Sequence, residues 1–239
     1  MTKIYAGTSG WAYASWKPGF YPPKLASAKF LSYYATRLNT VEVNYTFRAW
    51  VSEKLLAGWI QATPTHFKFA IKAHQKITHV LRLRSAGSAT SAFLASLEPL
   101  RAHDRLGPVL FQLPPFLKCD VGLLEDFLGV LSPATRAAME FRHISWFVDD
   151  VYERLRRANV ALCRAESEKL ETPEVDTADF NYFRLRKQQY SASERKTLKR
   201  KIADASDRGD VFVYFKHEDT PEGAVYAEAL LQNVEDNRP

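Results

Sequence analysis

The sequence has little that would tie it to a membrane or to a disulfide framework. Its 239 residues include only two cysteines, Cys119 and Cys163, too few for a disulfide-stabilised scaffold. No apolar run approaches the ~20 residues that span a bilayer. The chain opens on residues 3–7 without the apolar core of a signal peptide. We therefore expect a cytoplasmic protein with free thiols and no membrane partner.

Motifs that identify cofactors are also missing. Residues 7–10 read Gly-Thr-Ser-Gly and match neither the dinucleotide fingerprint G-x-G-x-x-G nor a Walker loop. Neither H-E-x-x-H, C-x-x-C nor an acidic calcium loop occurs. We predict no cofactor, and a divalent metal held by Glu42, Glu140 and nearby histidines is the less favoured alternative.

What the chain does have is basic charge and many aromatic residues. Lys and Arg number 33 against 27 Asp and Glu, a net charge of +6, and aromatics make up 13%. This balance favours an anionic partner, either a small molecule or nucleic acid. Residues 194–201 form a basic run within a predicted helix. Such a run is usually a solvated face, and a phosphate-binding patch is the alternative.

Apolar segments of strand and helix character alternate along the whole chain. The predicted strands cover residues 3–8, 40–44, 67–72, 108–113, 137–141, 160–163, 181–185 and 210–216. The predicted helices cover residues 28–38, 52–62, 88–100, 123–131, 148–158, 193–207 and 223–234, with no convincing helix in 164–178. Alternation of this kind predicts one α/β domain, residues 1–239, folded as a parallel (β/α)₈ TIM-type barrel. An open doubly wound sheet is the alternative.

The predicted strands end in polar residues. Apolar runs are followed by Glu42 and Asn44, by Lys72, by Gln112, by Glu140 and Arg142, by Arg184 and Arg186, and by Lys216. A strand buried in a parallel sheet should be almost entirely apolar, so these positions are exceptional. Side chains alternate between the two faces of a strand, which would place these residues inside the barrel near its C-terminal mouth.

These residues predict a site for an anion. We expect Glu42 and Glu140 to act as general acid and base. Seven residues would bind the substrate, namely Asn44, Lys72, Gln112, Arg142, Arg184, Arg186 and Lys216. Arginine forks suit carboxylate and phosphate groups. The alternative is an internal ion-pair network that closes the barrel without a function.

Aromatic residues and histidines follow several of the same strands. Trp11 and His143 are added to the candidate substrate-binding residues. The aromatic rings of the first loop could stack on a ligand, although core packing is the more common use. His74, His79, His143 and His217 lack metal-ligand spacing, so local hydrogen bonds are expected.

The motifs taken together resemble the YecE-like family, domain of unknown function 72. The resemblance is carried by residues 7–11, 20–22, 33–35, 40–44, 46–47, 72–73, 78–79, 107–115 and 140–147. It covers nearly the whole chain and implies a TIM-type barrel, related in outline to the endonuclease IV and xylose isomerase barrels. It implies no settled activity.

The chain departs from this family pattern at three strand ends. Arg48 directly follows Thr46-Phe47, where the family usually shows Tyr-Arg. Residues 184–187 read Arg-Leu-Arg-Lys instead of Arg-x-His-Gly, and residues 215–217 read Phe-Lys-His instead of Phe-Asn-Asn. These changes add positive charge, which disfavours a divalent metal and favours an anionic ligand. We expect an enzyme of the hydrolase, lyase or isomerase type, with a nucleic-acid or repair-linked protein and a non-catalytic ligand sensor as alternatives.

Overall fold

Eight parallel strands form the centre of the molecule in a computed structural model that describes residues 2–166, 170–216 and 219–236. The strands are β1 (Ile4–Thr8), β2 (Thr40–Val43), β3 (Lys68–Lys72), β4 (Leu106–Gln112), β5 (Ala137–Glu140), β6 (Ala161–Ala165), β7 (Phe180–Leu185) and β8 (Asp210–Phe215). Their order in the sheet is β1-β8-β7-β6-β5-β4-β3-β2. The predicted parallel eight-stranded barrel is confirmed, and the strands curl until β1 faces β2.

Closure between β1 and β2 uses side chains as well as the backbone. A single parallel bridge joins Ser9 to Glu42. Asn39 accepts a hydrogen bond from the Ala6 N–H and donates one to the Ile4 carbonyl, each at 2.9 Å. Gly7 permits the close approach, because a Cβ there would lie 2.0 Å from the Thr40 carbonyl oxygen. The barrel is therefore nearly closed, with only a short join on this side.

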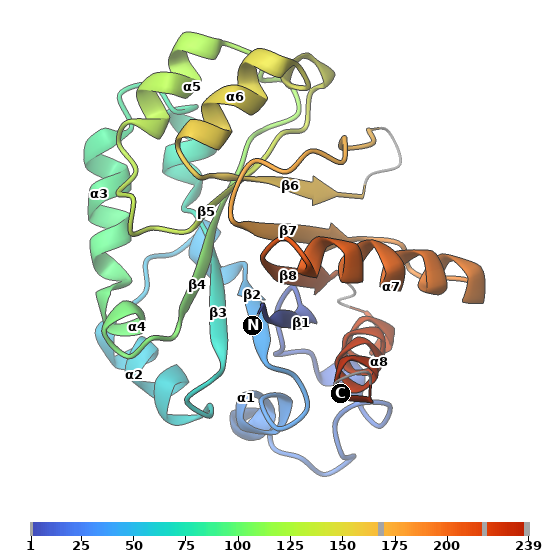
Figure 1. Ribbon diagram of the computed structural model, residues 1–239. Helices are drawn as coiled ribbons and strands as arrows, with labels where there is room; N and C mark the ends of the chain where they lie inside the picture. The colour runs from blue at the N-terminus through green and yellow to red at the C-terminus, as the bar shows by residue number, and fades with distance from the viewer. Residues whose placement is uncertain (1, 167–169, 217–218, 237–239) are drawn as a thin grey trace.

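Helices surround the strands (Figure 1). They are α1 (Phe30–Tyr34), α2 (Glu53–Gln61), α3 (Gly87–Ser96), α4 (Glu98–Ala102), α5 (Val121–Leu128), α6 (Asp149–Arg157), α7 (Ala192–Ser206) and α8 (Glu222–Asp236). Short 3₁₀ turns occur at Ala14–Trp16, Ser27–Lys29, Tyr45–Phe47 and Ile144–Trp146, and a π-helical turn at Lys76–Val80. Because no helix separates β6 from β7 in residues 170–179, this part of the helical layer is thin, as expected.

Two predicted helices differ from those in the structure. The single helix expected over residues 88–100 is wrong, since α3 ends at Ser96 and α4 begins at Glu98. Pro99 explains the break, because its ring cannot continue a helix from the preceding turn and it fits the first turn of a new one. The helix expected over residues 28–38 is α-helical only in α1, which a 3₁₀ turn precedes.

The strands separate two cores, and the polar strand ends belong to the inner one. The barrel interior is filled by Tyr5, Ala70, Leu110, Ala138, Ala161, Cys163, Phe180, Tyr182, Phe212 and Tyr214. A larger core lies between the strands and the helices. Moving two residues along the strand from Ala70, Leu110, Ala138 and Tyr182 leads to Lys72, Gln112, Glu140 and Arg184. These four residues are therefore on the inward face, as strand alternation predicts.

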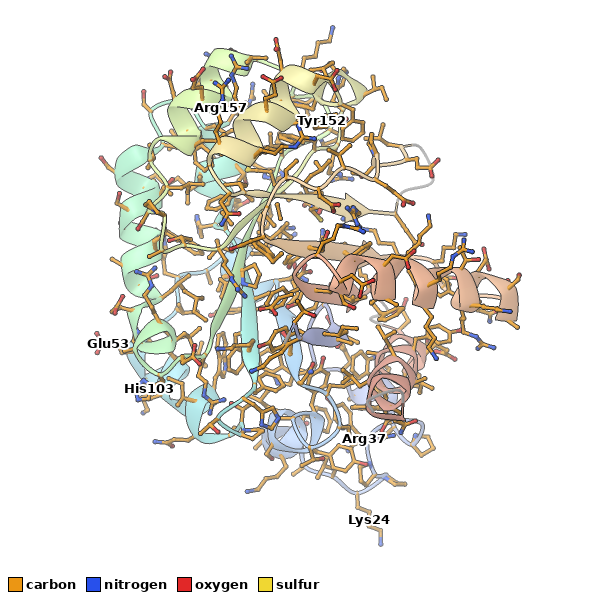
Figure 2. The ribbon with its side chains drawn as sticks, in the orientation of Figure 1. Lys24, Arg37, Glu53, His103, Tyr152 and Arg157 are labelled. Atoms are coloured by element: carbon orange, nitrogen blue, oxygen red, sulfur yellow. The ribbon has the colours of Figure 1, made fainter. Side chains whose placement is uncertain are left out.

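The C-terminal helix packs beside the N-terminal part of the chain. Arg37, just after α1, donates from Nε to Glu228 of α8 at 2.7 Å, and its guanidinium lies 4.6 Å from the Phe20 ring centre (Figure 2). This contact fixes α8 against the first βα unit, and Arg37 is labelled in Figure 2. In the described part of the chain, no helix combines the length and apolarity needed to cross a bilayer.

Candidate functional site

Three charged side chains form an ion-pair network at the C-terminal end of the barrel interior. Arg184 of β7 lies between two carboxylates, donating to Glu42 of β2 from Nη2 at 2.8 Å and to Glu140 of β5 from Nη1 at 2.5 Å. The exposed fractions are 0% for Glu42, 1% for Glu140 and 3% for Arg184. One guanidinium therefore links strands on opposite sides of the barrel. We call these three residues the floor.

The remaining acceptor sites of the two carboxylates are also occupied. Ser9 Oγ and Tyr182 Oη each donate to Glu42 at 2.7 Å. Gln112 Nε2 donates to both oxygens of Glu140 at 2.9 Å, and Arg186 Nη2 donates to the Glu140 Oε1 at 2.8 Å. Buried charge is tolerated only when it is paired and fully hydrogen-bonded, and the floor meets that condition.

The floor keeps its charges at neutral pH. Burial alone would raise the pKa of Glu140, but Arg184 and Arg186 outweigh it and bring that pKa to about 2. The pKa of Glu42 is lowered in the same way, since Arg184, Ser9 and Tyr182 overcome the effect of burial. Burial would lower the pKa of Arg184, yet the two glutamates raise it well above its ordinary value. Both acids are carboxylates, without a proton to donate.

A pocket of about 560 Å³ opens above the floor. It is lined by Asn44, Tyr45, Phe47, Arg48, Lys72, Gln112, Arg142, Arg184, Arg186 and Lys216. Each of these residues stands at or just after the C-terminal end of a strand, where barrel enzymes place their active sites. All seven residues predicted to surround the two glutamates line this space, which we call the mouth pocket. Glu42 and Glu140 lie beneath its lining.

The charge of the mouth pocket is of one sign. Six cationic side chains line it, and no acidic residue does so among residues 2–166, 170–216 and 219–236. Arg48, Arg142 and Lys216 are exposed, and we call them the rim. Arg186 is partly buried, and its Nε has no hydrogen-bond partner within the same described ranges. The pocket therefore has donor groups that a bound anion could use.

Lys72 occupies the wall of the mouth pocket. Its Nζ donates to Gln112 Oε1 at 2.9 Å and lies 4.2 Å from the centre of the Phe47 ring. Burial and the nearby Arg184 lower the pKa of Lys72 to about 8. It is thus the one group lining the described pocket whose pKa is shifted to near neutrality.

The two further candidates lie outside the pocket lining. The Trp11 ring meets Trp59 of α2 edge-on, with ring centres 5.6 Å apart, and packs against the outer core. His143 bonds through Nδ1 to Ser145 Oγ at 2.8 Å. The aromatics of the first loop are largely core residues, as favoured, since Trp16, Phe20 and Tyr21 are buried.

Tyr45, Phe47 and Arg48 line the pocket, although none of them is among the site residues predicted from the sequence. All three belong to the 3₁₀ turn after β2 or directly follow it. The signal that could have identified them is the position of Arg48, where the chain departs from the usual family pattern. A turn has no period of two, so alternation could not show which of its side chains face the pocket.

The histidines that follow the strands make hydrogen bonds within their own loops. His74 Nδ1 accepts from the Lys76 N–H at 3.2 Å, and His79 Nδ1 bonds to Thr78 Oγ1 at 2.9 Å. The local hydrogen bonds expected for these two and for His143 are confirmed, while His217 lies outside the described residues. Within those residues, no three His, Cys, Asp or Glu side chains are placed to hold a metal ion. Glu42 and Glu140 do not fit that use either, because arginines already neutralise them.

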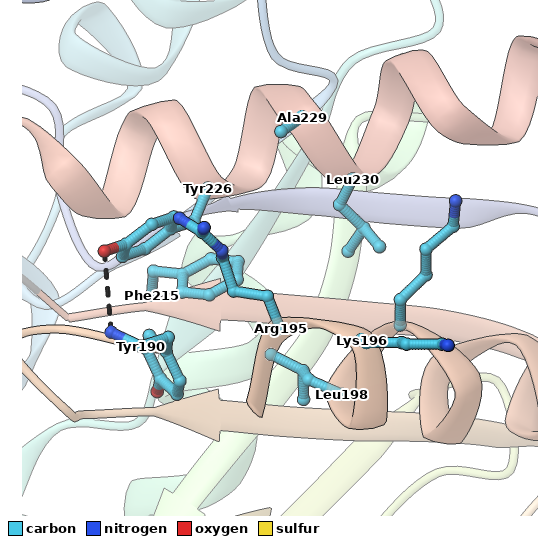
Figure 3. A pocket seen from close by; sticks show the side chains of 9 residues that line it. Tyr190, Arg195, Lys196, Leu198, Phe215, Tyr226, Ala229 and Leu230 are labelled. Atoms are coloured by element: carbon cyan, nitrogen blue, oxygen red, sulfur yellow. Dashed lines mark hydrogen bonds between the residues drawn. The ribbon is translucent and has the colours of Figure 1, made fainter. Parts of the chain in front are cut away.

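A second pocket lies on the outside of the barrel, between α7 and α8 (Figure 3). It measures about 290 Å³ and is lined mainly by apolar and aromatic residues such as Phe215, Tyr226 and Leu230. Arg195, Lys196 and Lys199 of the basic run also reach it. The basic run at residues 194–201 lies within α7, as the predicted helix places it. This helix begins with a capping box between Ser191 and Glu194.

A family model described as "Protein of unknown function DUF72" matches residues 5–239. The chain belongs to the DUF72 family. Over 157 residues, 63% of this chain, it is 34% identical to the UPF0759 protein YunF of Bacillus subtilis (strain 168). That match spans about half, 54%, of the length of this relative.

Solved structures agree with the DUF72 assignment. A DUF72 family protein from Thermotoga maritima MSB8 is 28% identical, with a TM-score of 0.86 over 98% of this chain and 99% of that one. A DUF72 family protein from Enterococcus faecalis V583 is 18% identical, with a TM-score of 0.80 over 96% and 95%. A GH18 chitinase from Pseudoalteromonas aurantia is 9% identical, with a TM-score of 0.52 over 97% and 99%, which shows a likeness of fold alone.

Proposed function

We propose that this DUF72 protein binds a small molecule carrying a carboxylate or phosphate in the mouth pocket and acts on it by general acid–base chemistry. The observation that carries the proposal is the one-sided charge of the pocket, with six cations in the lining and both nearby carboxylates held beneath it. An anion would complete the hydrogen bonding of Arg186 and lower the repulsion among the rim cations. The partner is therefore a small anionic metabolite.

The proposed roles follow from position. Arg186 and Lys72 would contact the anion at depth, and the rim would attract it from solvent. Arg184 is fixed by Glu42 and Glu140, so its guanidinium needs no rearrangement on binding, while the two carboxylates offset its charge and leave the attraction of the anion to the other cations. That the two glutamates act as acid and base stays a prediction, and their saturated contacts support a positioning role. Lys72, with its pKa lowered to about 8, is the better placed proton carrier.

The first test is stabilisation by anions. Inorganic phosphate and oxalate are titrated into the protein, with sodium chloride at the same ionic strength as the reference. A bound ligand at one hundred times its Kd should raise the free energy of unfolding by ~2.7 kcal/mol. Arg186→Gln should lose most of this gain, whereas Arg157→Met should keep it, because Arg157 ends α6 on the outside of the barrel (Figure 2). Equal stabilisation by chloride and by both anions would overturn the proposal.

A ligand sensor would use the same pocket without turnover. The two possibilities separate once a ligand is known, since an enzyme converts it and a sensor returns it unchanged. Mass spectrometry of small molecules released from protein purified without added anions identifies the ligand, and prolonged incubation with that compound then reports conversion. If the protein releases only uncharged molecules and is not stabilised by phosphate or oxalate, anion binding is contradicted for both the enzyme and the sensor.

A second candidate function is binding of a nucleic-acid backbone along α7. The observation that favours it is the row of exposed cations on that helix, Arg195, Lys196, Arg200 and Lys201, although Lys201 already pairs with Glu174. Backbone binding depends steeply on salt because counterions are released. A gel-shift titration with single- and double-stranded DNA and RNA at two salt concentrations tests this, and the absence of any salt-sensitive shift would rule the candidate out.

A further inference from the structure

Lys72 differs from the other deep cations of the mouth pocket because no carboxylate pairs with it in the described part of the chain. Arg184 and Arg186 are held by Glu42 and Glu140. At the opposite end of the same strand, Lys68 pairs with Asp104 at 2.6 Å. Lys72 has a neutral amide oxygen and an aromatic ring as its neighbours instead. An uncharged amine can donate to Gln112 as well as an ammonium can, so of the two neighbours only the face of the Phe47 ring favours the charged form.

The groups that face Lys72 come from every side of the barrel mouth. Arg184 and Arg186 of β7 oppose its charge, and Glu42 and Glu140 below favour it. His79, on the turn after β3, packs edge-on against the same Phe47 ring, and burial and Lys72 lower its pKa. Burial has the largest effect on Lys72 and Arg184 the next, so that the pKa falls to about 8. This lowered pKa increases the share of uncharged Lys72 amine near neutral pH.

An uncharged, partly buried amine at the wall of an anion pocket is a nucleophile for carbonyl groups. We propose that Lys72 forms an imine with a carbonyl compound that also carries an anionic group, such as a 2-oxo carboxylate. This inference rests on the proposed function, because Arg186 and the rim would hold the anionic group while the carbonyl carbon meets Nζ. It narrows the substrate class from any small anion to an anionic aldehyde or ketone.

The step balances without an oxidant or a reductant. The Nζ lone pair forms the C–N bond while the carbonyl π electrons move to oxygen. The nitrogen then loses one proton, and the oxygen gains one to become a hydroxyl. The hydroxyl then takes up a second proton, the one released to solvent when the lysine ammonium became an amine, and departs as water while the nitrogen lone pair forms C=N, which leaves the imine nitrogen protonated. The product is an imine plus one water molecule. The positive charge of the protonated imine replaces that of the lysine, so the pocket keeps its attraction for the anion.

Reductive trapping tests the inference. Pyruvate and sodium cyanoborohydride are added to the full chain, and peptide mapping by mass spectrometry locates the secondary amine that forms. Modification should concentrate at Lys72 and proceed about tenfold faster than at Lys76, an exposed lysine in the turn after the same strand. Acetone, a carbonyl without an anionic group, should be trapped at Lys72 more slowly than pyruvate at the same concentration, because it lacks the group that the pocket would bind. The rate at Lys72 should rise with pH and level off above about pH 8.

Variants separate chemistry from charge. Lys72→Arg should keep anion-dependent stabilisation and give no adduct at position 72, and Lys76→Met, the matched control, should trap pyruvate at the normal rate. If Lys72→Arg fails to fold, a competing ligand that protects Lys72 from trapping in the unaltered protein provides the same information. Lactate, which has the carboxylate but no carbonyl, should slow the trapping of pyruvate at Lys72 in the unaltered protein.

The outcomes distinguish the inference from the function on which it rests. If lactate and pyruvate stabilise the protein but Lys72 is not modified faster than Lys76, imine formation is overturned and anion binding stands. If neither anion stabilises the protein and no lysine is preferentially trapped, both proposals are overturned. Preferential trapping at Lys72 that lactate suppresses supports both.

Discussion

The floor and the rim of the mouth pocket both consist of charged side chains, but the floor holds two carboxylates and one guanidinium in a buried place, whereas the rim holds three exposed cations. The floor is buried, and Arg184 alone makes three hydrogen bonds to Glu42 and Glu140. The rim is exposed, and its Arg48 and Arg142 form no ion pair with any residue that the structure describes. The floor residues stand on strands, while the rim residues follow them. For these six residues, a position on the strand goes with burial, and a position beyond the strand goes with exposure to solvent.

The difference has an energetic reason. A charge inside the barrel loses its hydration, so it must be paired within the protein to be tolerated. A charge beyond the end of a strand keeps contact with water and can be tolerated without an ion pair. We therefore expect substitutions in the floor to alter the free energy of unfolding, and substitutions in the rim to alter affinity. Three predictions test this division.

The largest effect is expected for Arg184→Met. The substitution leaves two buried carboxylates without their shared cation, and such losses cost about 3–5 kcal/mol of unfolding free energy. Urea denaturation of the purified variant measures the change. Arg142→Met is the matched control in the rim and should stay within ~0.5 kcal/mol of the original protein. If Arg184→Met does not yield folded protein, Arg184→Lys should show a smaller loss, and a loss below ~1 kcal/mol in both would contradict the role of the floor.

A smaller, pH-dependent effect is expected for Glu140→Gln. Glu140 has its pKa lowered to about 2 from an ordinary 4.5, so it adds stability that is complete above 4.5 and is lost as the pH falls towards 2. The original protein should therefore lose unfolding free energy on acidification more steeply than the variant does. The difference per pH unit is at most ~1.4 kcal/mol for one proton.

The measurement is a set of urea titrations from about pH 5 to about pH 3, with the slope against pH compared between the two proteins. Glu153→Gln serves as the control, because Glu153 is exposed and lies 3.9 Å from Arg157 in an ion pair that contributes little. The control should leave the slope of the original protein unchanged. Parallel slopes for Glu140→Gln and the original protein would mean that Glu140 gains no stabilisation as a carboxylate.

The sequence predicts which residues form the floor but not how they pair. Alternation along β2, β5 and β7 places Glu42, Glu140 and Arg184 on the inner face without any knowledge of contacts. Which residue pairs with which depends on the tilt and stagger of the closed barrel, and no local pattern encodes that. The hydrogen bond from Tyr182 to Glu42 joins residues 140 positions apart for the same reason.

Loop residues were harder to place than strand residues. Trp11 and His143 follow strands, as the rim residues do, but their loops turn them toward Trp59 and Ser145 instead of the mouth pocket. The division of the helix expected over residues 88–100 has a local cause in Pro99, which could have been recognised. The fold was therefore predictable from periodicity, and the composition of the pocket only where periodicity extends into it.

The smallest effect is expected in the rim, for Arg142→Met. Exposed charges contribute little each, so the affinity for phosphate should fall about two- to fivefold, or ~0.5–1 kcal/mol. Isothermal titration calorimetry at low and high salt measures this. Because salt screens exposed charges, the difference from the original protein should shrink as salt rises.

Arg157→Met, at the far end of α6, is the control for this last prediction and should bind phosphate as the original protein does at either salt concentration. A loss in Arg142→Met that persists at high salt would mean that Arg142 contacts the anion directly and behaves as a deep residue. In that case the ligand-contacting part of the mouth pocket would extend into the exposed rim. A loss that vanishes with salt would place the boundary of that part where the strands end, since the rim would then act through its long-range field.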